Sequence, residues 1–260
     1  QKYRQRNKIA SANYTLVISG GKVYSTGKSD SGALGLGDVT EIDEFTEIPG
    51  LNNIVEVAVG SDHSLALDKD GKVFVFGKGV YGQLGLGYAN NQNIPILIPN
   101  LPKIVSVIAS LSVSALLTED GKVYTFGTNI GDRNKPFVFV PTLNIELSNI
   151  IQVVLGNNFL LALDNNGKVY GYGDTNHGQI AYDTDYYIFE NVKKARYPPN
   201  VMYIAAANVE SYAVDTNGKL YANGYNFGKT EGRKRGLPID FKAYKVYPAG
   251  FYFSGSGASN

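Results

Sequence analysis

The chain has 260 residues, and its 24 Lys and Arg residues almost balance its 23 Asp and Glu residues, giving a net charge of +1. This balance does not favour nucleic-acid binding, and the absence of cysteine excludes disulfides and thiolate metal sites. No apolar run reaches the roughly 18 residues of a membrane span. Since no signal peptide is visible either, a cytoplasmic protein is expected, or one in the cytosol or nucleus of a host cell if it is a secreted effector.

A four-residue signature of Gly, Lys, an aliphatic residue and an aromatic residue recurs along the chain. The five copies are Gly21–Tyr24, Gly71–Phe74, Gly121–Tyr124, Gly167–Tyr170 and Gly218–Tyr221. Their spacing is about 50 residues, and another glycine follows each copy in the same frame. A period of this size indicates a repeat architecture.

The second copy, taken in chain order, predicts four short strands. They cover Ile54–Val59, Ser64–Leu67, Lys72–Phe76 and a weaker segment near Ile94–Ile98, and we label them A to D. Asp70-Gly71 joins strands B and C, and such a pair predicts a tight hairpin because glycine accepts a positive φ. The first copy fits the same pattern with one residue fewer in its turn. No segment shows the 3.6-residue stripe of an amphipathic helix.

A four-stranded sheet cannot bury both faces alone, whereas repetition around an axis covers both faces. The sequence therefore predicts an all-β fold, a β-propeller of four-stranded antiparallel blades with the apolar strand A innermost. Gly60 and Gly156, which follow strand A, are interpreted as close-packing positions. We expect one domain over residues 1–260, with repeats at about 9–53, 54–103, 104–149, 150–200 and 201–240 and a partial sixth at 241–260.

The order of motifs in the second copy carries a family resemblance. An apolar strand is followed by Gly60-x-x-His63-Ser64, a second strand, Asp70–Gly77 and the run Tyr81–Gly87. The first copy retains Gly32–Gly37 of the last run. In these motifs the chain resembles the regulator of chromosome condensation repeat family over nearly its whole length. The resemblance implies a propeller, commonly of seven blades, whereas this sequence supplies five repeats and a fragment.

The antiparallel order of the strands places the A–B turns and the C–D loops at one end of each blade. These segments differ between copies, while the B–C turns are almost identical, so the variable end is the expected binding face. The candidate partner-binding residues from the A–B turns are Asp62, His63, Asn157, Asn158, Asn208 and Glu210. Those from the C–D loops are Arg133, Lys135, Asp183, Asp185, Tyr186, Arg233, Lys234 and Arg235.

His63 has two interpretations, as a packing residue or as a functional one, and packing is the favoured interpretation. The only other histidine is His177, and no cluster of His, Asp and Glu has metal-ligand spacing, so no metal site is expected. The run Gly82–Gly87 is not followed by a helix, which removes the dipole that a phosphate site would use. No catalytic residue and no cofactor are expected.

The resemblance implies a guanine-nucleotide exchange factor, or another modulator, of a small GTPase of the Ran type. In exchange-factor members of the family, acidic and histidine residues of the A–B turns face the GTPase, and Asp62 and His63 match that motif. The alternative is a non-catalytic adaptor or inhibitor module that binds another protein, because a fold does not fix a function. Both alternatives imply a protein partner and no covalent chemistry, and a monomer is expected.

Overall fold

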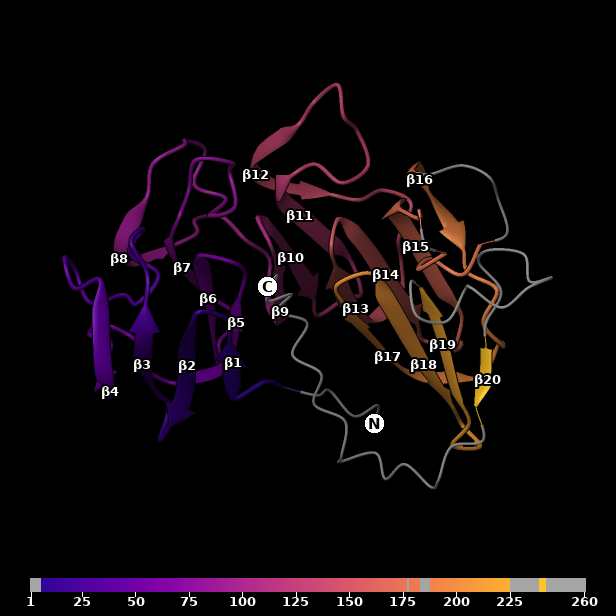
Figure 1. Cartoon of the computed structure of the whole chain (residues 1–260), viewed down its shortest axis with the longest axis horizontal. Helices are drawn as coiled ribbons and strands as arrows, with labels where there is room; N and C mark the ends of the chain where they lie inside the picture. The colour runs from indigo at the N-terminus through magenta and orange to yellow at the C-terminus, as the bar shows by residue number, and fades with distance from the viewer. Residues whose placement is uncertain (1–5, 177, 183–187, 225–238, 242–260) are drawn as a thin grey trace.

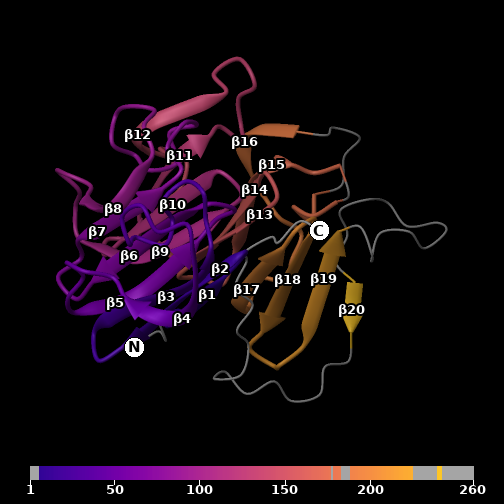
Figure 2. The ribbon, with the colours of Figure 1, turned by 60° about the vertical axis from the view of Figure 1, so that its left-hand side comes forward.

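Five antiparallel sheets of four strands each form the structure, a computed structural model that describes residues 6–176, 178–182, 188–224 and 239–241. The strands of every sheet follow one another in chain order. The sheets stand side by side along an arc (Figures 1 and 2). This arrangement confirms the expected all-β propeller fold, and we call the sheets blades 1 to 5. None of the described segments forms a helix long and apolar enough to cross a membrane.

The strand bounds follow the repeat. Blade 1 has β1 (Ile9–Ser11), β2 (Tyr14–Ser19), β3 (Lys22–Lys28) and β4 (Glu41–Glu47). Blade 2 has β5 (Ile54–Val59), β6 (His63–Asp68), β7 (Val73–Gly77) and β8 (Gln92–Leu97). Blade 3 has β9 (Ile104–Ser110), β10 (Val113–Thr118), β11 (Val123–Thr128) and β12 (Phe137–Leu143). Blade 4 has β13 (Ile150–Gly156), β14 (Phe159–Asp164), β15 (Val169–Asp174) and β16 (Ile188–Lys194). Blade 5 has β17 (Val201–Ala207), β18 (Glu210–Asp215), β19 (Leu220–Gly224) and β20 (Ile239–Phe241).

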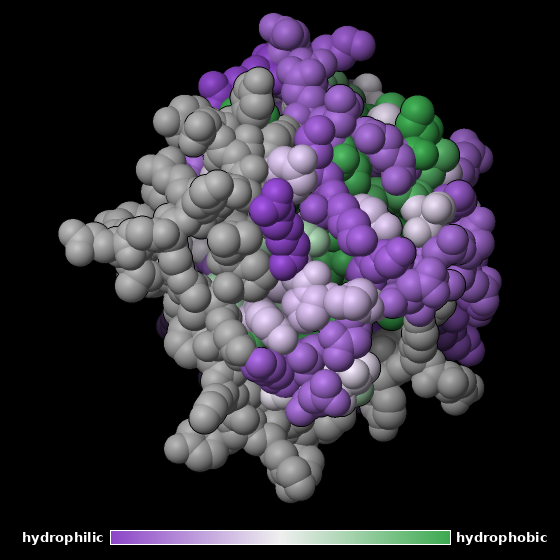
Figure 3. Space-filling model, turned by 90° about the vertical axis from the view of Figure 1, so that its right-hand side faces the viewer, coloured by the Kyte–Doolittle hydropathy of each residue, from purple (hydrophilic) through white to green (hydrophobic). Residues whose placement is uncertain are grey.

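The first strand of each blade is the innermost, as expected. β1 contacts β5, β5 contacts β9, β9 contacts β13 and β13 contacts β17. The fourth strands lie at the outer rim, and β4, β8 and β12 are largely exposed. On the side of blades 4 and 5 the described surface is mainly hydrophilic (Figure 3).

The hydrophobic core lies between the blades. One cluster joins blade 1 to blade 2 and includes the buried side chains of Leu16 and Phe76. A second cluster joins blade 2 to blade 3 and includes Leu65 and Phe126. A third cluster extends from blade 3 through blade 4 to blade 5. Stacking therefore buries the faces that a lone sheet would expose.

The described strands of blade 1 and blade 5 do not close the arc into a ring. None of the larger contacts among the described strands joins the two blades, which stand at opposite ends of the arc in Figure 1. Phe241, expected to open a sixth repeat, pairs in β20 with Leu220 of β19 and so belongs to blade 5. The rest of the expected sixth repeat, residues 242–260, lies outside the described residues.

The B–C hairpins of blades 2 to 5 have three-residue loops. In blade 2 the Gly71 N–H donates to Asp68 O at 3.1 Å, and the Asp68 N–H donates to Lys72 O at 2.9 Å. Gly71 has a φ of +87°, and the Asp68 carboxylate accepts hydrogen bonds from the Asp70 and Lys72 N–H groups. In blade 1 the loop has two residues, Gly20 and Gly21, which both have positive φ. The one-residue difference predicted from the sequence is therefore confirmed.

The glycine-rich runs connect each blade to the next. A Cβ added at Gly82 would lie 2.3 Å from Val138 O of blade 3, and one added at Gly85 would lie 2.9 Å from the Phe126 ring. The next blade thus fills the space that a phosphate would need. Gly60 is also a packing position, as expected, because a Cβ there would lie 2.3 Å from the His63 ring and 2.4 Å from Leu111 O.

Candidate protein-binding face

The A–B turns and the C–D loops lie at the same end of each blade, as the strand order requires. Backbone hydrogen bonds join the two segments within a blade. The Lys78 N–H donates to Asp62 O at 2.8 Å in blade 2, and the Thr128 N–H donates to Ser112 O at 2.9 Å in blade 3. The Asp174 N–H donates to Asn158 O at 2.8 Å in blade 4. We call the surface formed by the A–B turns and C–D loops the loop face.

Neighbouring A–B turns are also connected to one another. The Ser61 N–H donates to Leu111 O of the next blade at 3.0 Å, and the Asn157 N–H donates to Asn208 O at 2.6 Å. The inner part of the loop face is therefore held by backbone contacts within and between blades. A surface fixed in this way can bind a partner with little loss of conformational entropy.

Asp62 lies on the loop face with a partly exposed side chain. Its Oδ1 accepts a hydrogen bond of 2.6 Å from Ser29 Oγ of blade 1. Ser29 Oγ in turn accepts hydrogen bonds from the N–H groups of Ser31 and Ala33, which shape the C–D loop of blade 1. Asp62 thus presents a carboxylate whose position is fixed by the neighbouring blade.

His63 is fully buried, which is the packing role that the sequence favoured. Its Nε2 lies 2.8 Å from Ser114 Oγ of blade 3, and Ser114 Oγ donates to Gln83 O at 2.7 Å. Because the serine hydroxyl has one proton, His63 Nε2 must donate in the first contact. Burial lowers the pKa of His63 to about 3, so the imidazole is neutral and is not an acid or base near neutral pH.

Other blades use the position of His63 in the same way. Tyr14 pairs with Gly27 of β3, as His63 pairs with Gly77 of β7, and the Tyr14 hydroxyl donates to His63 O at 2.6 Å. Phe159 holds the position in blade 4 and Glu210 holds it in blade 5, where both are buried. Both His63 and Glu210 were candidates for partner binding, and in the structure their buried side chains offer little surface to a partner.

We expect the replacement of His63 by phenylalanine, the residue at this position in blade 4, to destabilise the protein by only about 1 kcal/mol. The substitution keeps a buried ring but loses the hydrogen bond to Ser114, whose hydroxyl still has Gln83 O as an acceptor. Urea unfolding of this variant, of Ser114→Ala and of the double variant would measure the coupling. A coupling near zero would contradict the hydrogen bond.

The remaining predicted residues differ in how the structure presents them. Asn158 and Asn208 are exposed and have positive φ values of 59° and 48°, while Asn157 is partly buried. Arg133 and Lys135 are exposed in the C–D loop of blade 3. The Asn129 N–H donates to Pro136 O at 2.8 Å and closes that loop. Asp183, Asp185, Tyr186, Arg233, Lys234 and Arg235 lie outside the described residues.

The described loop face therefore carries a carboxylate, amides and two cationic side chains on a fixed backbone. No three His, Cys, Asp or Glu residues among the described residues are grouped so that they could hold a metal ion. Polar and charged groups that surround a preformed surface suit recognition of a protein.

Comparisons with known proteins agree with this fold. A family model described as "Regulator of chromosome condensation (RCC1) repeat" matches residues 20–67 and 70–117, and a second model with the same description matches residues 54–83 and 150–179. A search of curated proteins gave no match.

Solved structures of this kind resemble the chain closely in shape and distantly in sequence. The structure of human WBSCR16 matches with a TM-score of 0.77 and 22% identity over 92% of this chain and 68% of that chain. Yeast RCC1 (Prp20) bound to Kap60 matches with a TM-score of 0.76 and 23% identity over 91% of this chain and 63% of that chain. Prp20p from Saccharomyces cerevisiae, described with its binding properties to Gsp1p and histones, matches with a TM-score of 0.73 and 20% identity over 91% and 65%. The chain thus spans about two thirds of the length of these structures.

Proposed function

We propose that the loop face binds a small GTPase of the Ran type and promotes or modulates nucleotide exchange, because the chain carries repeats that match the regulator of chromosome condensation repeat models over residues 20–117 and 150–179. The observation that supports this proposal is the loop face itself, where Asp62, Arg133 and Lys135 project from a backbone held by hydrogen bonds. The similar Prp20p is described with binding properties to Gsp1p and histones.

The proposed mechanism is a competition between two ligands of the GTPase. A propeller that binds the nucleotide-free GTPase more tightly than the nucleotide-bound form must lower the affinity of the GTPase for its nucleotide by the same factor. No proton transfer is needed, which agrees with the neutral, buried state of His63. Asp62 and Arg133 would contribute charge contacts that align the partner.

A second candidate function is that of an adaptor or inhibitor module. The observation that favours it is the burial of His63, because only Asp62 of the motif that matches exchange-factor members remains at the surface. Such a module would bind its partner without changing the rate of nucleotide release.

Release of a fluorescent GDP from a Ran-type GTPase, together with binding measured in GDP, in a GTP analogue and in EDTA, tests both functions. We expect Asp62→Lys and Arg133→Glu each to weaken binding about three- to tenfold, with a smaller effect at high salt because rim charges are screened. Charge reversal at Lys72, beside the B–C turn at the opposite end of blade 2, is the control.

The outcomes separate the candidates. Faster GDP release that depends on Asp62 and Arg133 supports exchange, whereas binding that leaves release at the spontaneous rate supports the adaptor or inhibitor. If Lys72→Glu abolishes binding while the loop-face variants bind normally, the proposed face is wrong. If none of the nucleotide states binds, the GTPase proposal fails.

A further inference from the structure

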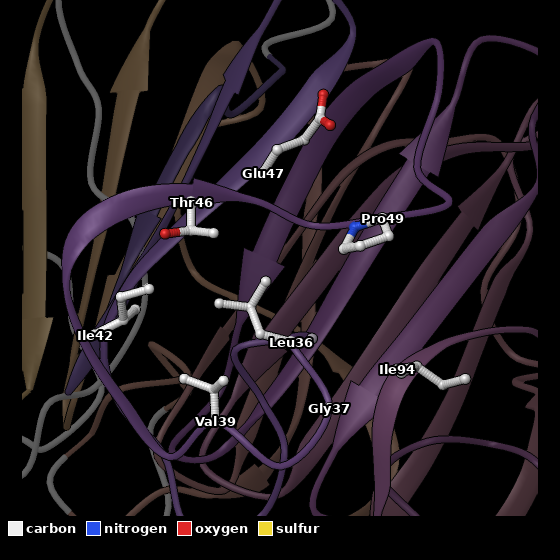
Figure 4. A pocket seen from close by; sticks show the side chains of 9 residues that line it. Leu36, Gly37, Val39, Ile42, Thr46, Glu47, Pro49 and Ile94 are labelled. Atoms are coloured by element: carbon white, nitrogen blue, oxygen red, sulfur yellow. The ribbon is translucent and has the colours of Figure 1, made fainter.

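A groove lies at the outer rim of the propeller, between the fourth strands of blades 1 and 2. Its volume is about 510 Å³, within the range of about 300–1,000 Å³ typical of ligand pockets. Figure 4 shows the side chains grouped about this hollow. The apolar lining residues are Leu36, Val39, Ile42, Pro49 and Ile94.

Two of the apolar side chains that line this groove are accessible. Val39 is 39% exposed and Ile94 is 52% exposed. Exposed apolar surface with a polar border is typical of interaction sites, because contact between apolar surface and water is unfavourable in free energy. The groove therefore has the features of a docking site for an apolar group.

The segment that contributes β4 to one side of the groove is strongly acidic, and we call it the acidic wall; among its carboxylates Glu47 lines the groove itself. The segment on the other side is uncharged. Residues 38–47, which include β4, contain five carboxylates and no Lys or Arg. They are Asp38, Glu41, Asp43, Glu44 and Glu47. Residues 88–100, which include β8, contain no charged side chain. Across the described part of the chain, none of the five carboxylates has a Lys or Arg nitrogen within 4.0 Å. The acidic wall therefore leaves negative charge available to a cationic partner.

Contacts between the two blades hold the groove in shape. The Gly37 N–H donates to Asn93 O at 3.0 Å, and Asn93 Nδ2 donates to Asp38 Oδ1 at 3.3 Å. A Cβ added at Gly32 would lie 2.5 Å from Asn93 Cα, so the loop of blade 1 is in close contact with β8. A preformed groove of this kind binds a ligand without first paying an ordering cost.

We propose that this groove docks an extended segment of a partner protein, in which one or two bulky apolar residues are flanked by Lys or Arg. The apolar residues would enter the groove beside Leu36 and Ile94, and the flanking cations would lie along the carboxylates of β4. Nucleic acid and anionic membrane would be repelled by the same carboxylates. The proposal goes beyond the GTPase interaction, since the groove shares no residue with the set Asp62, Arg133 and Lys135.

A fluorescent ten-residue peptide, with Leu-Phe at its centre and Lys or Arg at the flanking positions, is the probe for this proposal. Fluorescence anisotropy would follow its binding to the full chain. We expect saturable binding that weakens as salt is raised, because the flanking charges are exposed. The double variant Glu44→Lys with Glu47→Lys should weaken binding at least about tenfold. Asp70→Lys, the same kind of charge change at a B–C turn, should leave it unchanged.

The apolar part of the interaction has its own test. The variant Ile94→Ser should weaken binding of the Leu-Phe peptide, whereas a peptide with Ala-Ala at its centre should bind weakly to both the parent and the variant. Melting temperatures of the variants would establish that they fold. The proposal is overturned if the Leu-Phe peptide shows no saturable binding up to about 1 mM. It is also overturned if Asp70→Lys weakens binding as much as the Glu44 and Glu47 double variant does. Neither result bears on nucleotide release at the loop face.

Discussion

Replacing Gly127 with valine is expected to lower the melting temperature of the propeller by about 10 °C, which corresponds to a loss of roughly 3 kcal/mol or more. Gly127 lies near the end of β11 in blade 3 with a φ of +97°, and a Cβ there would lie 2.1 Å from Ser112 O. The obstacle is backbone of the A–B turn, which cannot rotate away as a side chain could. The valine would therefore impose a steric clash in addition to an unfavourable φ.

Gly50→Val is the matched control for this substitution. Gly50 has a φ of +86°, and no atom lies within 4 Å of a Cβ added there. The control should cost only the conformational strain of a left-handed valine, about 1–2 kcal/mol. Differential scanning calorimetry of both variants would measure the difference. Equal melting temperatures would show that the contact with Ser112 is not a structural requirement.

Local sequence signals were sufficient to predict the blades. Strand A of the second repeat was predicted at Ile54–Val59, and β5 has these bounds. The shorter turn of the first repeat was also predicted, since the first copy has one residue fewer between its strands than the other copies have. A two-residue loop is a common hairpin connection. Both the strand bounds and the turn length depend on residues that are close together in the sequence, so the sequence alone is enough to predict them.

The location of the loop face also followed from strand order, whereas the burial of its members did not. His63 and Glu210 were both candidates for partner binding, although packing was the favoured interpretation of His63, and both side chains are buried. The His63 ring contacts Ser114 of the next blade. The pairing of His63 with Gly77 and of Glu210 with Gly224 is a long-range property of the sheet. Whether the side chain of an A–B turn residue is buried depends on how it packs against a neighbouring blade, whose residues lie about 50 positions away in the sequence.

The acidic wall of the groove shows a different limit. Five carboxylates between residues 38 and 47 are visible in the sequence, but they also fit a solvated outer strand. The proximity of β4, with Glu47, to Ile94 appears only when blade 2 stacks beside blade 1 and forms the groove. Sequence reasoning identified the residues that build the scaffold better than the surfaces formed between repeats.

Glu56 is a further residue whose role depends on neighbouring blades, since it is a carboxyl group within the innermost, apolar strand of blade 2. Its side chain is fully buried, and it accepts hydrogen bonds from the Asn7 N–H at 3.2 Å, from Ser106 Oγ at 3.0 Å and from the Val107 N–H at 2.6 Å. In blade 4, Gln152 makes the corresponding bridge, because its amide accepts from Ile204 N and donates to Ile204 O. One blade thus uses an acid where another uses a neutral amide.

Burial raises the pKa of Glu56 from 4.5 to about 7, although the three hydrogen bonds and the charge of Arg6 act in the opposite direction. The folded protein therefore binds a proton more tightly than the unfolded chain does. Stability from this group is fully present below about pH 4.5 and is lost as the pH rises toward 7. The difference of about 2.5 pKa units corresponds to roughly 3 kcal/mol.

We therefore expect Glu56→Gln to be more stable than the parent by up to about 3 kcal/mol at pH 8 and nearly equal to it at pH 4.5, because the amide can bridge the blades without a buried charge. The reciprocal variant Gln152→Glu should acquire a pH dependence of the same sign, and a smaller one, since Gln152 is only partly buried. Urea unfolding of the three proteins between pH 4.5 and pH 8 measures these differences. Subtracting the stability profile of Glu56→Gln from that of the parent removes the contribution of all other titrating groups.

The result that would contradict this prediction is a parallel change. If the parent and Glu56→Gln lose or gain stability in parallel over this pH range, the carboxyl of Glu56 is not the group that makes the contact between the blades sensitive to pH.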